Sequence, residues 1–121
     1  MRQYGIDSWE WLPNGELRTR SKVIPAISND GRTSQKLFFN AIVAVYTGWN
    51  DQRNKGPDSV HFGDGSQLPE ADVLRVDAIM QEIAVAVPWL QGDFVVIDNF
   101  LTQHSRRPFT LPRRILAYLF Q

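Results

Sequence analysis

The chain has 121 residues, no cysteine, and 13 basic side chains against 13 acidic ones. This length allows one domain at most, and the charge balance argues against a general nucleic-acid or membrane-surface binder, which would carry a basic excess. The lack of cysteine excludes disulfides and thiolate metal sites. Because there is neither a long apolar run nor an apolar leader at the first residues, we expect a soluble, cytoplasmic protein.

The N-terminal segment predicts a β-hairpin. Trp9 and Trp11 alternate with polar residues within residues 4–12, which is typical of a half-buried strand. Residues 13–15, Pro-Asn-Gly, form a turn signal, and residues 17–20 continue in extended form.

The next segment predicts further short extended pieces. Pro25 interrupts residues 22–27, which suits an edge strand because proline cannot donate to the ladder. Residues 28–31 predict a turn and residues 35–40 a strand. The apolar run over residues 41–46 fits the period of a helix as well as that of a strand, and we expect a strand end followed by a partly helical segment.

The middle of the chain predicts a loop, a glycine turn and one main helix. Residues 48–58 are polar and rich in turn formers, and residues 62–66 hold a tight glycine turn. Pro69 in the first turn and Pro88 directly after the last residue favour an amphipathic helix over residues 69–87. Its apolar residues recur at spacings of three and four: Val73, Val76, Met80, Ile83 and Val87.

The last third predicts two strands that enclose two candidate functional side chains. Residues 94–97 and 115–120 are strand-like, and a proline-punctuated loop between them carries His104 and leads to Arg114. Imidazole is a common ligand of iron, and a guanidinium matches the two oxygens of a carboxylate. A hairpin-like return would bring both toward one pocket, although a lone histidine is more often a hydrogen-bonded structural or surface residue.

The motifs extend this pattern along the chain. They are Phe39-Asn40, Ala44 to Trp49 with Arg53-Asn54, Phe62-Gly63-Asp64-Gly65, Trp89-x-x-Gly92-Asp93, Asp98-Asn99, His104 to Phe109, and Pro112-Arg113-Arg114. Together they resemble the C-terminal part of the Fe(II)- and 2-oxoglutarate-dependent dioxygenases of the taurine dioxygenase (TauD/TfdA) family. The likeness is greatest to plant clavaminate synthase-like proteins.

The resemblance implies a fold and a set of site residues. The fold would be a β-rich α+β domain, a partial double-stranded β-helix (jelly roll), with residues 1–121 as a single incomplete domain. His104 matches the distal iron ligand, and Arg114 matches the residue that binds the far carboxylate of 2-oxoglutarate, with Arg113 as a second candidate. Asn40 and Tyr118 would face a small-molecule substrate. Tyr118 stands where some members have an arginine for an acidic substrate, and a structural, backbone-capping role remains open for Asn40.

The chain departs from the family in its iron ligands. The family takes its other two ligands from a His-x-Asp or His-x-Glu motif, which this sequence lacks, and the acid nearest His61 lies three positions away. A facial triad needs two histidines and one carboxylate. We therefore expect that this chain binds neither Fe(II) nor 2-oxoglutarate stably alone and is inactive alone.

Two hypotheses remain for such a chain. In the first it is the C-terminal part of a 2-oxoglutarate dioxygenase, truncated or completed by a second chain that supplies the N-terminal half. In the second it is a non-catalytic β-rich remnant that serves binding or self-association. A stacking patch for nucleic acid at Arg106, Arg107 and Phe109 is the weaker interpretation of that basic segment because the chain is neutral overall.

Overall fold

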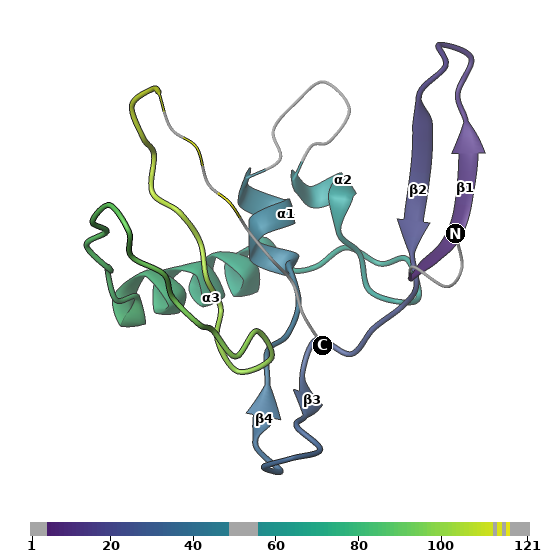
Figure 1. Ribbon diagram of the computed structural model, residues 1–121. Coiled ribbons are helices and arrows are strands. Elements are labelled where there is room, and N and C mark those ends of the chain that lie inside the picture. The colour runs from purple at the N-terminus through teal and green to yellow at the C-terminus, as the bar shows by residue number, and fades with distance from the viewer. Residues whose placement is uncertain (1–4, 49–55, 113, 115, 117–121) are drawn as a thin grey trace.

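The computed structural model describes residues 5–48 and 56–112 together with residues 114 and 116. The elements in chain order are β1 (Ile6–Trp11), β2 (Leu17–Ser21), β3 (Ser28–Asn29), β4 (Lys36–Leu37), α1 (Ile42–Gly48), α2 (Gly56–Ser59) and α3 (Glu70–Ile83) (Figure 1). The described residues thus form a mixed α and β structure with short antiparallel strands. Each of its sheets has two strands, so a jelly roll is not confirmed in this part of the chain.

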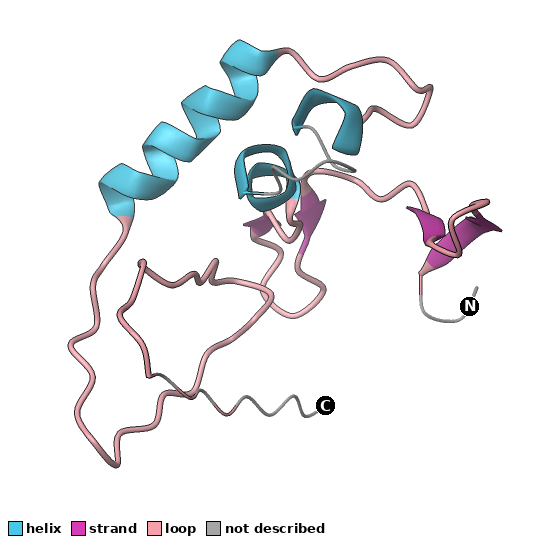
Figure 2. Cartoon of the chain, turned by 90° about the horizontal axis from the view of Figure 1, so that it is seen from above, coloured by secondary structure: helices cyan, strands magenta, loops and turns pink. Residues whose placement is uncertain are grey.

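The predicted N-terminal hairpin is confirmed. β1 pairs antiparallel with β2, with Trp9 opposite Thr19 and Trp11 opposite Leu17. Gly15 closes the turn at a φ of 82°, in the left-handed region that glycine adopts at little cost. The strands are not half-buried as predicted, because the hairpin stands apart from the helices in both views and leaves Trp11 69% exposed (Figures 1 and 2).

The second hairpin differs from the prediction in its boundaries. Residues 22–27 form no strand, and Ser28 and Asn29, expected in a turn, pair with Leu37 and Lys36 instead. The turn begins later because the Asp30 side chain accepts a hydrogen bond from the Arg32 amide at 3.0 Å. Such a local bond between side chain and backbone fixes the chain reversal after Asp30 rather than before it.

The apolar run after Asn40 is helical from Ile42 onward, without the strand end that was expected. Asn40 Oδ1 accepts a hydrogen bond from the Ile42 amide at 3.0 Å and so starts α1. Val43 and Tyr46 of this helix are buried against Val73 of α3, with Val76 and Met80 packed around them. This cluster is the hydrophobic core of the described residues.

α3 confirms the predicted main helix but is shorter. It begins after Pro69 and ends at Ile83, because Ala84 is already extended with a ψ of 129°. Of the predicted apolar stripe, Val73 is buried, whereas Ile83 and Val87 are exposed. The second half of the stripe has nothing to pack on in the described structure, so packing does not extend the helix toward Pro88.

The predicted strand over residues 94–97 is wrong in this structure. The segment is irregular chain in the long loop that follows α3, and Phe94 is 88% exposed. A strand needs a neighbour for its backbone N–H and C=O groups, and the described residues place none beside this segment. Of the predicted strand over residues 115–120, only Leu116 is described, as exposed irregular chain, and the rest lies outside the described residues.

No helix within the described ranges has the length and apolarity to cross a membrane.

Candidate functional site

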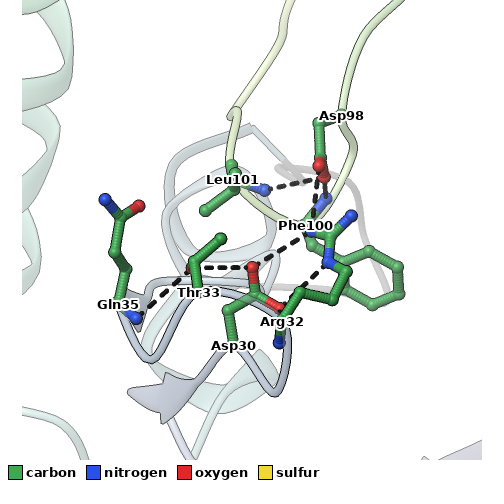
Figure 3. Close-up of polar contacts among 7 residues, drawn as sticks. All are labelled: Asp30, Arg32, Thr33, Gln35, Asp98, Phe100 and Leu101. Carbon is green, nitrogen blue, oxygen red and sulfur yellow. Dashed lines mark hydrogen bonds and ion pairs between the residues drawn. The ribbon is translucent and has the colours of Figure 1, made fainter.

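The segment that carries His104 is joined to the second hairpin through a charged cluster. Arg32 donates from Nε to Asp30 Oδ1 at 3.0 Å and from Nη2 to Asp30 Oδ2 at 3.2 Å, and its Nη2 also contacts Asp98 Oδ2 at 2.9 Å (Figure 3). Thr33 Oγ1 donates to Asp30 Oδ2 at 2.9 Å. One guanidinium therefore links two carboxylates that are far apart in the sequence.

The electrostatics of this cluster favour the charged forms. Asp30 is buried, and hydrogen bonds from the Arg32 side chain and amide lower its pKa from 3.8 to about 2. Burial alone would raise the pKa of Asp98, but bonds from the Phe100 amide and Arg32 outweigh it, so the pKa is lowered. The same contacts, led by Asp30, raise the pKa of Arg32.

Two further contacts fasten the turn that follows Asp98. The Phe100 ring packs on Phe39 with centroids 4.8 Å apart and lies under the Arg32 guanidinium at 5.7 Å. Gln103 Nε2 donates to the Phe38 carbonyl at 2.6 Å and lies 3.4 Å from the Asn40 carbonyl. The segment from Asp98 to Gln103 is thus attached to the second hairpin at three points.

His104 follows directly after the last of these contacts. Its imidazole is exposed, and its Nε2 lies 3.1 Å from Asn99 Oδ1. The imidazole is therefore accessible but already holds one side-chain partner. Its role as an iron ligand remains a prediction.

Arg114 is also exposed, while Arg113 and Tyr118 lie outside the described residues. Two of the hollows in the described structure lie near this segment. One of about 420 Å³ is lined by Arg106, Arg107, Pro108 and Phe109, and one of about 360 Å³ lies beside the charged cluster. Neither is lined by His104 or Arg114, so no shared pocket joins the predicted pair in these two places.

Asn40 uses both ends of its amide structurally. Its Nδ2 donates to the Ala26 carbonyl at 2.9 Å while its Oδ1 caps α1. This matches the capping role that the sequence left open. A substrate contact by Asn40 stays a prediction.

The described residues do not fit a complete iron site. They contain no group of three or more His, Cys, Asp or Glu side chains that could hold a metal ion. The second histidine, His61, is exposed and pairs through its backbone with Gln67. Within the described ranges, neither imidazole is therefore part of a group of three ligand side chains such as a facial triad for Fe(II) needs.

Sequence reasoning missed the cluster of Asp30, Arg32 and Asp98. The signal was weak: Asp30-Gly31-Arg32 has the spacing of a turn in which Asp bonds two residues on, and Asp98-Asn99 marks only a break. Nothing in one sequence links positions that lie this far apart. The pairing emerges only once the two segments are seen together.

A comparison with protein families matches residues 2–119 to the family described as taurine catabolism dioxygenase TauD, TfdA family. The chain belongs to the TauD/TfdA family. Among its relatives in this family is a clavaminate synthase-like protein of Arabidopsis thaliana, 48% identical over 110 residues, which cover 91% of this chain and 33% of that protein. Dapdiamide synthesis protein DdaC of Enterobacter agglomerans is 30% identical over 121 residues, covering 91% of this chain and 36% of DdaC.

The chain therefore spans about a third of the length of the curated TauD/TfdA relatives that it matches. The family uses Fe(II) and 2-oxoglutarate. The resemblance expected from the motifs is thus confirmed at the level of the family.

Proposed function

We propose that this chain is the C-terminal portion of an Fe(II)- and 2-oxoglutarate-dependent dioxygenase that hydroxylates a small molecule. The observation that carries the proposal is the family match, which runs over residues 2–119 and includes the motifs at His104 and Arg114. His104 supplies the distal iron ligand, and Arg114 binds the far carboxylate of 2-oxoglutarate, with Arg113 as the weaker candidate. The remaining ligands come from polypeptide outside these 121 residues.

The exposed surface of the chain supports this dependence on further polypeptide. A compact monomer of 13.9 kDa exposes about 6,700 Å², whereas this chain exposes 11214 Å². Large apolar side chains such as Trp11 and Phe94 contribute to the excess. In the proposal, the rest of a double-stranded β-helix covers this surface and pairs the segments that form no strand here.

The test is turnover of 2-oxoglutarate to succinate with Fe(II), measured with and without a polypeptide that carries the His-x-Asp motif of a TauD/TfdA protein. The chain alone stays at the free-iron background, because one imidazole cannot hold the metal. The mixture turns over, and His104→Ala abolishes that turnover. Turnover by the chain alone that His104→Ala abolishes would contradict the incomplete site, and a mixture unaffected by His104→Ala would remove the histidine from the proposal.

The role of Arg114 has its own measurement. A charged hydrogen bond contributes about 1.5 to 3 kcal/mol, so Arg114→Ala in the mixture raises the KM for 2-oxoglutarate about 10- to 150-fold. Arg107→Ala is the matched control, since Arg107 lies in the same basic segment outside the predicted pair. Equal KM values in the two variants would exclude the carboxylate role of Arg114.

A non-catalytic binding or self-associating remnant is the second candidate. The observation that favours it is that the described residues hold no group of three ligand side chains. The DNA upstream of the codon for Met1 separates the two candidates. An in-frame or adjacent reading frame that encodes His-x-Asp supports the dioxygenase, and its absence supports the remnant.

A further inference from the structure

The turn before His104 contains Asn99, whose side chain contacts the imidazole, and both neighbours of Asn99 are held in place. Asn99 Oδ1 lies 3.1 Å from His104 Nε2. Asn99 stands between Asp98, which contacts Arg32, and Phe100, which packs on Phe39. Any movement of these two neighbours would displace Asn99 Oδ1, which is the partner of the imidazole.

The turn itself is tightly closed. Asp98 Oδ1 accepts hydrogen bonds from the amides of Phe100 at 3.0 Å and Leu101 at 3.3 Å (Figure 3). The Asp98 carbonyl accepts one from the Thr102 amide at 3.0 Å. Residues 98–102 therefore form one hydrogen-bonded unit. Where this unit lies is decided by its attachments to the second hairpin.

Arg32 makes the charged attachment, and it is preorganised for it. Its guanidinium is already fixed by two hydrogen bonds to the buried Asp30 before it reaches Asp98. An exposed ion pair contributes little to stability, because forming it costs the conformational entropy of both side chains. Here the Asp30 hydrogen bonds already order the Arg32 side chain, so only Asp98 has to be ordered for the contact. The contact to Asp98 is accordingly stronger than that of an isolated surface pair.

We propose that Arg32 is a positioning residue for His104: bound to Asp30, it holds Asp98 and so fixes the turn whose Asn99 orients the imidazole. The effect travels through Asp98 and Asn99, and Arg32 does not itself contact His104. The proposal rests on the proposed function in treating His104 as the functional imidazole. Its test involves no turnover, so its failure and that of the proposed function are separable.

The experiment is NMR on the full chain, with two readouts recorded at one fixed pH. The first is the NOE between the Phe39 and Phe100 rings, which reports docking of the turn. The second is the pair of ring nitrogen signals of His104, assigned with His61→Gln because the chain has two histidines. Arg32→Ala loses the NOE and shifts the His104 ring signals, whereas the helical circular dichroism of α3 is kept.

Two further variants exclude a general loss of structure. Arg18→Ala removes a comparable ion pair, Arg18 to Glu10, on the first hairpin and leaves both readouts unchanged. Asp98→Asn keeps a side-chain oxygen for the Phe100 and Leu101 amides, removes the charge that Arg32 contacts, and changes both readouts in the same direction as Arg32→Ala. Unchanged His104 ring signals in Arg32→Ala would overturn the proposal, as would an Asp98→Asn variant in which the NOE and the His104 ring signals both stay as in the unaltered chain.

Discussion

At the scale of single residues, Asp30 is a buried carboxylate with a strongly lowered pKa. Its carboxylate is buried and accepts hydrogen bonds from Arg32 and Thr33, which lower its pKa from 3.8 to about 2. A carboxyl group whose pKa is lower in the folded than in the unfolded state stabilises the fold above the unfolded pKa. That contribution is lost as the pH falls from about 4 toward 2.

This predicts an acid-dependent release of the turn that carries Asp98. The carboxyl carbon of Asp30, followed by NMR, titrates with a midpoint near pH 2, and the contact between the Phe39 and Phe100 rings fades over the same range. Asp30→Asn removes the charge and makes the contact weak at every pH. A midpoint at or above 3.8 would show that Arg32 does not hold Asp30 as the structure has it.

At the scale of the elements, the packing of α1 on α3 depends on very few side chains. Val73 is 4% exposed and meets Val43 and Tyr46, whereas its neighbour Leu74 is 47% exposed. Removing two buried carbons from Val73 loses their transfer free energy and leaves a cavity. Val73→Ala should therefore lower the free energy of unfolding by about 2 kcal/mol.

Urea denaturation followed by circular dichroism at 222 nm measures this effect. Leu74→Ala is the matched control on the same helix turn. It should change the free energy of unfolding by less than about 1 kcal/mol, since the Leu74 side chain is 47% exposed and the substitution removes little buried apolar area. The core is small, so the unaltered chain can itself have a free energy of unfolding of about 2 kcal/mol. In that case Val73→Ala loses the helical signal already in buffer without urea. A larger effect in Leu74→Ala than in Val73→Ala would contradict the assignment of the core face.

The elements also show how far the sequence alone could reach. Local signals predicted what local bonds decide: the turn at Pro13 to Gly15, the glycine turn at residues 62–66 and the start of α3 after Pro69. The apolar run over residues 94–97 predicted a strand, but a strand depends on a neighbour that the described residues do not contain. For the same reason α3 ends at Ile83, where its apolar stripe loses its cover.

The candidate site was predictable only in part. The chemistry of His104 and Arg114 can be inferred from residue type and motif, and the family match supports the motif. Their mutual placement depends on long-range packing, which a single sequence does not encode in any readable spacing. The cluster around Arg32 was missed for that reason, since its two carboxylates lie on segments separated by most of the chain.

At the scale of the whole molecule, the first hairpin presents an amphipathic sheet without cover. Trp9 and Trp11 lie on one face with their partners Thr19 and Leu17, because alternate residues of a strand share a face and directly opposite residues share it too. The other face carries the ion pair between Glu10 and Arg18. A two-stranded hairpin with an exposed apolar face is not independently stable in water, and its strand edges invite pairing.

We therefore expect the isolated chain to associate through this hairpin. Analytical ultracentrifugation at increasing concentration should give a mass above the 13.9 kDa of one chain. Trp9→Ser with Trp11→Ser should shift the distribution toward the monomer because it removes the largest apolar side chains of that face. The matched control, Glu10→Ser with Arg18→Ser, changes the opposite face of the same strands and should leave association unchanged or stronger.

A chain that stays monomeric with both tryptophans in place would mean that this face is covered from within the molecule. The proposal that further polypeptide completes the fold would then lose its main physical support.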